Sequence, residues 1–201
     1  MSGLRFDPMV GVLAVQGDFS EHQAALASVG VASRQVRVPA DLEGVEGLIL
    51  PGGESTTMLK LLELQGLSGP LAERIAEGLP VLATCAGLIL LASEVVEPAQ
   101  ASFGVLDITT ARNGYGRQIH SGTFPLEGEA APKGATGVFI RAPRILRAGP
   151  QVEVLASWNG DPVLVRQGPV LGACFHPELQ PGHFVTDMFC SLLRAAHDPS
   201  V

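Results

Sequence analysis

The sequence predicts a single α/β domain built on a mixed, mostly parallel sheet with helices on both faces. Short, almost wholly apolar runs alternate with segments of helical periodicity through the first half of the chain. Parallel strands covered on both faces have this continuous apolar character, and the alternation is typical of β-α units. No internal repeat and no linker rich in proline, glycine or serine marks a second domain. We therefore predict one domain over residues 10–196, with an N-terminal extension (1–9) and a C-terminal tail (197–201).

The first elements follow this alternation. Val10–Val15 is an apolar run that predicts a strand, and Phe19–Val29 has the periodicity of a helix. Gly30 supplies its stop, because glycine readily takes the left-handed conformation that ends helices. Arg34–Val38 and Gly47–Leu50 are predicted as the next two strands. The helix positions expected to face inward are Phe19, Ala25, Leu26 and Val29.

The next segments predict a second set of such units. Pro51-Gly52-Gly53 indicates a turn into a helix, which Ser55 or Thr56 can cap through a side-chain oxygen. The elements predicted after it are a helix over Leu71–Glu77, a strand over Pro80–Thr84 and a helix over Ala86–Ser93.

From Asp107 the pattern changes to strands with only turns between them. The strand-like segments are DITTAR, QIHSGTFPLEG, GVFIRA, VEVLASW, PVLVRQ and PVLGACF. Strands that follow one another so closely favour antiparallel pairing, since parallel neighbours need longer crossovers. We expect an antiparallel or mixed extension of the sheet, closed by a final helix over Gly182–Ala196.

Composition restricts the classes of partner. The net charge is −7 and the chain has no cluster of lysine and arginine, so neither nucleic acid nor an anionic membrane surface is an expected partner. The N-terminus lacks the apolar stretch of a signal peptide, and no apolar run is long enough to cross a bilayer. Three cysteines without a CxxC pair suit a reducing compartment. A soluble cytoplasmic protein is the expectation.

Cys85 is the candidate nucleophile. It lies in the segment ATCAG, where an apolar strand gives way to a helix and small residues permit a crowded, strained turn. The positive end of the helix that begins at Ala86 favours the thiolate, and the Ala86 amide is placed to donate to an oxyanion. We expect the other two cysteines, Cys174 and Cys190, to be core thiols, because both lie within apolar patterns.

His176-Pro177-Glu178 follows the last apolar strand and supplies a candidate base. The residue before a proline is extended, so the side chains of His176 and Glu178 face the same side and the carboxylate can orient the imidazole. Parallel strands bring both Cys85 and His176 to one edge of the sheet. The other histidines lack such a partner nearby in the sequence: His183 and His197 are expected on the surface, and His22 and His120 each flank a loop at the active edge.

The loop Leu50–Ser55 carries two adjacent glycines. Such a pair lets a peptide turn its amide toward a ligand, which makes Gly53 the candidate for a second oxyanion donor. Arg112 and Arg141 lie in polar or turn contexts, where they are either solvated or bind a substrate carboxylate. A zinc site would have to combine Cys85, Cys174 and His176 without the closely spaced ligand pairs of such sites, so we expect no metal and no cofactor.

Six segments together resemble one family. They are VLAVQGD (12–18), LILPGGESTT (48–57), TCAGLILLA (84–92), RNGYGRQ (112–118), FIRAP (139–143) and FHPEL (175–179). In this order they resemble the class I glutamine amidotransferases, and among these the glutaminase subunits of pyridoxal phosphate synthase. The resemblance extends over nearly the whole chain.

The resemblance implies a flavodoxin-like glutaminase fold with a triad of Cys85, His176 and Glu178. The glutamine contacts that it implies are Gly53, Glu54, Ser55, Arg112, Ile140 and Arg141. It also implies a partner, a separate (β/α)8-barrel synthase that consumes the ammonia to build the cofactor from a pentose phosphate and a triose phosphate.

Two departures from the family pattern are visible. Ala83 stands where the nucleophile turn usually carries glycine, and alanine is small enough for that turn. His120-Ser121-Gly122 alters the stretch after RNGYGRQ, at a position that concerns either the partner or the substrate. We further expect Gln16, at the end of the first strand, to lie between the catalytic site and a docked synthase.

Two other functions are compatible with parts of the sequence. The first is the glutaminase of another pathway, such as the one feeding imidazole glycerol phosphate synthesis, and the RNGYGRQ and FIRAP segments argue against it. The second is a flavodoxin-like cysteine protein acting as a redox sensor or chaperone. Such a protein would keep a reactive cysteine but would not need the histidine and glutamate of FHPEL.

Overall fold

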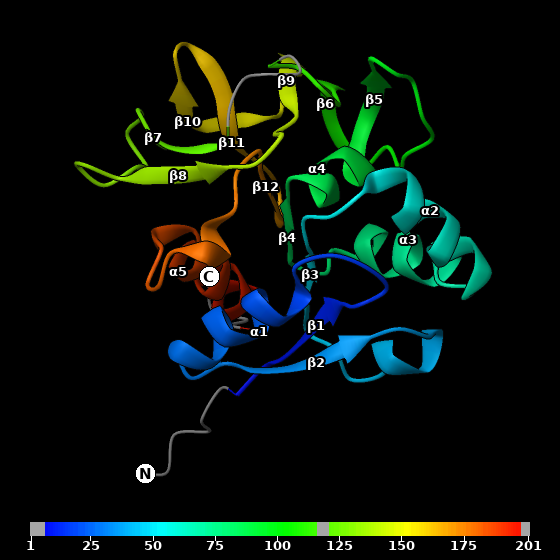
Figure 1. Ribbon diagram of the computed structural model, residues 1–201. Coiled ribbons are helices and arrows are strands. Elements are labelled where there is room, and N and C mark those ends of the chain that lie inside the picture. Colours follow the sequence, from blue (N-terminus) through cyan, green and yellow to red (C-terminus); the bar gives the residue numbers. More distant parts are fainter. Residues whose placement is uncertain (1–6, 116–120, 198–201) are drawn as a thin grey trace, which may run out of the picture.

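A seven-stranded sheet forms the centre of the molecule (Figure 1). The structure is a computed structural model and describes residues 7–115 and 121–197. The strand order is β10-β11-β12-β4-β3-β1-β2. The strands that run parallel to one another are β1 (Met9–Leu13), β2 (Ala32–Val36), β3 (Gly47–Leu50), β4 (Val81–Thr84) and β12 (Val170–Ala173). β3, β4 and β12 are buried along their whole length, as their apolar sequences predict.

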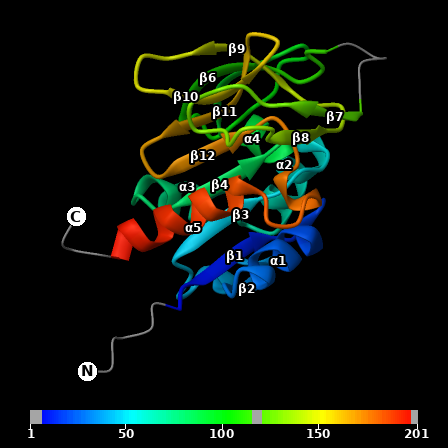
Figure 2. The same ribbon diagram turned by 90° about the vertical axis from the view of Figure 1, so that its left-hand side faces the viewer.

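Helices cover both faces of this sheet, as two views at right angles show (Figures 1 and 2). α1 (Phe19–Ser28) and α5 (Phe184–His197) lie on one face, and α2 (Ser55–Leu64) and α3 (Ser68–Ala76) lie on the other. The short helix α4 (Ala86–Leu91) follows β4 directly, and two 3-10 turns complete the helices, η1 (Pro39–Leu42) and η2 (Pro177–Leu179). The predicted α/β fold class is confirmed.

The second half of the chain extends the sheet only in part. β10 (Glu153–Trp158) and β11 (Asp161–Gln167) continue it by antiparallel pairing next to β12. β5 (Ala92–Val96), β6 (Leu106–Ala111) and β9 (Arg144–Ala148) form a separate three-stranded sheet, and β7 (Gly122–Pro125) and β8 (Thr136–Phe139) form a hairpin. Because β12, β11 and β10 already occupy the edge beside β4, the remaining strands pair among themselves. The expectation that all of them extend one sheet was wrong.

Several boundaries also differ from the sequence prediction. α3 begins at Ser68 and not at Leu71, because Pro70 fits in the first turn of a helix, where its missing N–H removes no bond. The helix predicted over Ala86–Ser93 ends at Leu91, and the chain enters β5, which was not predicted.

The inward face of α1 was assigned correctly for Leu26, which is buried, and incorrectly for Val29. Val29 is 37% exposed, whereas the buried residues of the helix are His22 and Leu26. These two are four positions apart and therefore lie on the same face of the helix. An ionisable residue, His22, thus lies on the inward face, for which the prediction had named only apolar residues.

The carboxyl ends of β1, β3, β4 and β12 lie along one edge of the sheet, as parallel strands require. β1 pairs with β2 on one side and with β3 on the other, so the strand order reverses at β1. The edge beside such a reversal is the usual ligand-binding position in open α/β sheets. In the described part of the chain, no helix is long and apolar enough to cross a membrane.

Candidate active site

A cavity of about 500 Å³ opens at this edge of the sheet. Its walls come from the loops that follow β1, β3, β4, β6, β8 and β12. The lining residues are Gln16, Gly17, Asp18, Gly53, Glu54, Ser55, Cys85, Ala86, Ile89, Arg112, Asn113, Ile140, Arg141 and His176. Nearly all of the site residues that the sequence predicted are therefore collected around one hollow.

Cys85 lies in this cavity in a strained backbone conformation. Its φ of 47° and ψ of −103° are rare for a residue with a side chain. Two hydrogen bonds hold the turn: the Cys85 N–H donates to the Ala173 carbonyl at 2.8 Å, and the Gly87 N–H donates to the Pro51 carbonyl at 3.1 Å. The thiol is 7% exposed and its sulfur lies 3.9 Å from the Ile140 carbonyl oxygen. The strained turn predicted from ATCAG is confirmed.

The two residues predicted as oxyanion donors, Ala86 and Gly53, line the same cavity as Cys85. Ala86 is the first residue of α4, so its N–H has no acceptor within the helix and is left for a ligand. Gly53 has a φ of 157° and lines the same cavity. A β-carbon on neighbouring Gly52 would lie 2.4 Å from Cε1 of His176, so only glycine lets this loop pass the imidazole.

Gln16 holds the glycine loop from the other side. Its side-chain oxygen Oε1 accepts a hydrogen bond from the Glu54 N–H at 2.8 Å. The carbonyl of Gly52 accepts a second bond, from the Asp18 N–H at 3.2 Å. In a trans peptide the N–H points opposite to the carbonyl, so the Gly53 N–H points away from Asp18. The residues after β1 therefore fix the orientation of the loop after β3.

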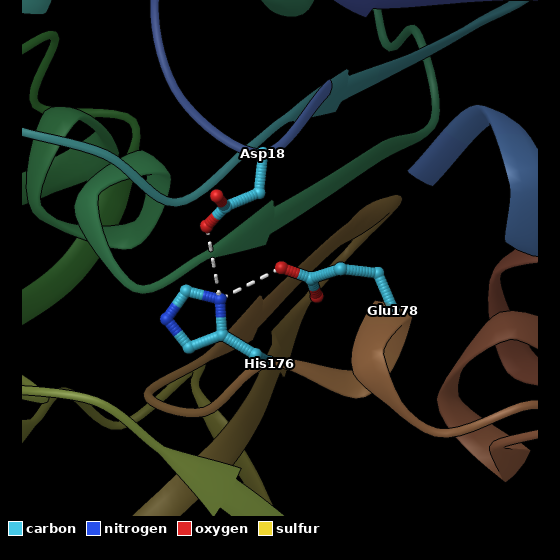
Figure 3. Close-up of side chains that lie close together, drawn as sticks. All are labelled: Asp18, His176 and Glu178. Atoms are coloured by element: carbon cyan, nitrogen blue, oxygen red, sulfur yellow. Dashed lines mark hydrogen bonds and ion pairs between the residues drawn. The ribbon is translucent and has the colours of Figure 1, made fainter. Parts of the chain in front are cut away.

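His176 is oriented by Glu178, as the FHPEL segment predicts. Both side chains are buried, and Nδ1 of His176 lies 2.7 Å from Oε1 of Glu178 (Figure 3). Burial alone would lower the pKa of His176, but its contacts with Cys85 and Glu178 outweigh burial and raise the pKa to about 10. Burial would raise the pKa of Glu178, whereas His22 and His176 lower it, and the net direction is downward. The resting pair is therefore an imidazolium beside a carboxylate.

A second carboxylate approaches the same ring nitrogen. Figure 3 shows Asp18, which comes from the loop after β1, with its Oδ2 at 3.5 Å from Nδ1 of His176. Asp18, His176 and Glu178 thus place three potential metal ligands within 4.8 Å of one another. The carboxylates of Asp18 and Glu178 both face Nδ1 of His176, and the 2.7 Å contact with Glu178 has the length of a charge-assisted hydrogen bond. We therefore interpret the two carboxylates as groups that orient the imidazole ring.

Glu54 and Arg112 form an ion pair in the cavity, with Nη2 of Arg112 at 3.0 Å from Oε1 of Glu54. Glu54 also caps α2, because it immediately precedes the helix and its carboxylate accepts from the amides of Thr56 and Thr57. The prediction of Ser55 or Thr56 as the cap was wrong. The Thr57 hydroxyl and these amides hold the pKa of Glu54 at about 2. An anion is thereby fixed beside a guanidinium.

The remaining predicted contacts differ in how they face the cavity. Arg141 and Ile140 line it from the loop after β8, and Arg141 has a φ of 46°, a second strained residue at this site. Ser55 lines it as well, but its hydroxyl donates to Oε1 of Gln100 at 2.9 Å and is thus already engaged.

The other histidines separate into different environments. His183 is 8% exposed and bonds to the Thr136 carbonyl, so its assignment to the surface was wrong; it packs between the rings of Phe175 and Phe184. His197 is exposed, as predicted. His120 lies outside the described residues, and the two cysteines Cys174 and Cys190 are buried core thiols, as predicted.

Five residues at or behind the site were not predicted, namely Gly17, Asp18, His22, Ile89 and Asn113. Gly17, Asp18, Ile89 and Asn113 line the cavity. His22 is buried behind it, with Nε2 at 3.4 Å from Oε2 of Glu178, a partner far from it in the sequence. Its position four residues before Leu26, on the inward face of α1, was the sequence signal that could have revealed it.

The fold and the site together define a class. A cysteine on a strained strand-to-helix turn, with an amide donor after it and a carboxylate-oriented histidine opposite, is the equipment of an α/β enzyme that forms a covalent acyl intermediate.

Comparison with known proteins places the chain within this class. Residues 12–194 match the family described as SNO glutamine amidotransferase, and the chain belongs to that family. It is 52% identical over 171 residues to the pyridoxal 5'-phosphate synthase subunit PdxT of Thermotoga petrophila, covering 85% of this chain and 91% of the relative. It is 48% identical over 190 residues to the PdxT subunit of Mycobacteroides abscessus, covering 94% and 98%. A crystal structure of a glutamine amidotransferase superposes with a TM-score of 0.86 at 46% identity, covering 92% and 98%. The family resemblance drawn from the sequence is confirmed.

Proposed function

We propose that this chain hydrolyses L-glutamine to L-glutamate and ammonia, as the glutaminase subunit of a pyridoxal 5'-phosphate synthase. The observation that carries the proposal is the joint presence, in one cavity, of the strained Cys85, the oriented His176 and the charged pair of Glu54 and Arg112. The first two supply acyl-transfer chemistry, and the charged pair matches a zwitterionic amino acid.

The first half of the reaction breaks the amide bond. The sulfur of Cys85 attacks the side-chain amide carbon of glutamine, and the negative charge on the oxygen is stabilised by the N–H groups of Ala86 and Gly53. The C–N bond then breaks, and His176 delivers its proton to the departing nitrogen, which leaves as ammonia. A glutamyl thioester on Cys85 remains.

The second half releases glutamate. His176, now neutral, takes a proton from a water molecule whose oxygen attacks the thioester carbon. The same two amides stabilise the second oxyanion, the C–S bond breaks, and the thiolate returns. Glu178 acts throughout by holding Nδ1 of His176 and favouring its protonated form.

Substrate recognition follows from the charges around the cavity. Arg112 and Arg141 bind the α-carboxylate of glutamine, since a guanidinium donates paired hydrogen bonds to a carboxylate. Glu54 accepts from the α-ammonium group and remains ionised at neutral pH, given its pKa of about 2. The backbone of Gly53 and Ile140 and the side chain of Ser55 complete the contacts.

The ammonia has a defined destination in this proposal. The relatives of M. abscessus and T. petrophila are named as subunits of pyridoxal 5'-phosphate synthase. We infer a cytoplasmic complex in which a separate (β/α)8-barrel synthase subunit receives the ammonia. Gln16, bonded to the glycine loop, is the residue through which the partner acts on the oxyanion donors.

The test uses the purified chain and a glutamine-mimicking electrophile, with the labelled cysteine located by mass spectrometry. Selective labelling of Cys85 that glutamine blocks is the expected result, together with loss of ammonia release in Cys85→Ala when the synthase subunit is present. Cys190→Ala is the matched control, because that thiol is buried in α5 away from the cavity. The proposal would be contradicted if glutamine did not reduce the labelling of Cys85, or if Cys85→Ala still released ammonia. Either result would favour a redox or chaperone function.

A further inference from the structure

The second carboxylate oxygen of Glu178 has an unusual environment. Oε1 is bonded to His176, but Oε2 is buried and lacks a conventional hydrogen bond among the described residues. The polar atom facing it is Nε2 of His22, at 3.4 Å. A buried carboxylate oxygen without a donor is costly, so the facing imidazole is its available source of stabilisation.

His22 reaches Glu178 from the buried face of α1. It is 2% exposed, and the same nitrogen, Nε2, lies 3.1 Å from the hydroxyl oxygen of Thr84. Thr84 is the last residue of β4 and immediately precedes Cys85. One imidazole nitrogen therefore stands between the residue that supports the nucleophile and the carboxylate that orients the base.

The chemistry of these groups fixes the direction of the hydrogen bond. An ionised carboxylate only accepts, so a bare Nε2 lone pair facing Oε2 would be repulsive. The tautomer with the proton on Nε2 instead donates toward both Oε2 of Glu178 and Oγ1 of Thr84. This tautomer also leaves the Thr84 hydroxyl free to rotate to another acceptor.

Burial, and not the surrounding charges, keeps this donor neutral. Burial lowers the pKa of His22. Glu178, Asp18 and Glu21 oppose this effect and His176 reinforces it, and the net direction is downward. A neutral donor stabilises Oε2 without neutralising Glu178, which keeps its charge for His176.

From this geometry we propose that His22 is a positioning residue of the catalytic triad, one that holds Glu178 and Thr84 so that Oε1 of Glu178 stays on Nδ1 of His176. This inference rests on the proposed function, because it assigns a supporting role for the same chemistry. His22 does not line the cavity. It therefore acts through Glu178 and makes no contact with glutamine.

The test compares His22→Leu, which removes the donor, with His22→Gln, which keeps an N–H donor in the same direction. His183→Leu is the matched control, since it removes another buried histidine, one whose ring nitrogens bond to backbone atoms of Thr136 and Val185. Glutamine hydrolysis is measured across pH together with the synthase subunit. In a second assay, the rate at which iodoacetamide alkylates Cys85 is measured across pH on the chain alone.

We expect His22→Leu to lower kcat by about tenfold or more with KM unchanged, in line with the loss of one hydrogen bond to a charged group. The alkaline limb of the hydrolysis profile should move to lower pH, because a displaced Glu178 no longer favours the His176 imidazolium. The pH profile of alkylation should be displaced as well, because the same imidazolium lies beside Cys85. His22→Gln should restore most of the rate and the position of the limb. Should the leucine variant not fold, His22→Asn, whose shorter amide cannot reach Glu178, carries the same expectation.

Two outcomes would overturn the proposal. One is a His22→Leu variant with unmoved limbs, whatever its rate, since a structural defect lowers the active fraction without moving a pH profile. The other is a shift of equal size in His183→Leu. The alkylation assay needs no glutamine. Absence of glutaminase activity in the wild-type chain assayed with the synthase would therefore refute the proposed function, while the alkylation assay still decides the role of His22.

Discussion

Cys85 keeps a φ of 47° although it carries a side chain. Such a conformation costs on the order of 1–3 kcal/mol and persists only where surrounding contacts enforce it. Here the Cys85 amide is bonded to β12 and the Gly87 amide to the end of β3, so two strands of the sheet hold the turn. The strain aims the sulfur into the cavity, between the amide of Ala86 and the imidazole of His176.

The roles of His176 and Glu178 lead to a prediction about pH. His176→Asn should lower kcat by about 10²–10⁴-fold, because it removes the group that transfers protons, and Glu178→Gln should lower it less. The carboxylate of Glu178 raises the pKa of His176, so its removal lets the imidazolium lose its proton at lower pH. The alkaline limb of kcat/KM should therefore move downward in Glu178→Gln. Equal losses of kcat, or an unmoved limb, would contradict these roles.

The two arginines are predicted to act on binding. Arg112→Ala and Arg141→Ala should each raise KM for glutamine by about 10–100-fold, the range for a lost hydrogen bond to a charged group, with a smaller effect on kcat. Steady-state kinetics on both variants decides the matter. Arg166→Ala is a suitable control, since Arg166 bonds to the Gly168 carbonyl and does not line the cavity. A fall in kcat with unchanged KM would assign these arginines to another task.

At the residue level, the sequence predicted the three residues of the triad but not the residues that hold them in place. Cys85, His176 and Glu178 could be found because the strained turn of ATCAG and the FHPEL segment have short, recognisable spacing. His22 and Asp18 could not, because their link to the triad passes through space, between α1 or its preceding loop and η2. A buried histidine on a helix face is also difficult to distinguish in sequence from an exposed one.

Among the elements, the loop after β6 shows how the separate three-stranded sheet serves the cavity. Arg112 begins this loop, and Gly114 passes directly over β9, where a β-carbon on Gly114 would lie 2.1 Å from Cβ of Arg144. Arg144 is itself held by two contacts of 2.9 Å with Asp161 of β11. The small sheet thus anchors Arg112, the residue that we propose binds the substrate carboxylate.

Gly114→Ala tests this anchoring. The added methyl group cannot fit against the Arg144 backbone, so the loop must move and carry Arg112 away from Glu54. We expect a KM raised by about tenfold or more with little change in Tm, measured by kinetics and thermal unfolding. Gly69→Ala is the control, because a β-carbon there meets nothing within 4 Å. A KM unchanged from the wild type would show that the loop tolerates the displacement.

Elements governed by local pattern were predicted well, and those governed by competition for the sheet edge were not. β3, β4 and β12 are buried on both sides, and their apolar runs are unambiguous. β5 begins directly at the end of α4, inside one continuous apolar stretch, so periodicity could not separate a helix from a strand there. β9 has the sequence RILRA, with only one buried residue, and it gave no strand signal.

For the whole molecule, the decisive question is how the proposed partner controls the site. We expect the chain alone to be a poor glutaminase and the barrel synthase to activate it through Gln16 and the glycine loop. In the structure Gln16 and Asp18 hold that loop by hydrogen bonds from the side of β1. A partner that docks there and shifts these two residues can therefore change the orientation of the peptide that carries the Gly53 N–H. Ammonia release with and without synthase, for wild type and Gln16→Ala, is the measurement. Full activity of the lone chain, or intact activation in Gln16→Ala, would refute this mechanism.

The position of β12 in the sheet has a consequence during synthesis of the protein on the ribosome. β12 is the last strand of the described chain to be synthesised, yet it lies beside β4. His176 comes shortly after β12 and follows Cys85 by 91 positions (176 minus 85). At about 5–20 residues per second, a ribosome needs roughly 5–18 s to travel from the codon of the nucleophile to that of its base. During this interval the nascent chain carries a cysteine that nothing can activate. The nascent chain is therefore catalytically inactive until its final strand is inserted. The strand order of the sheet thus delays the first turnover until synthesis is nearly complete.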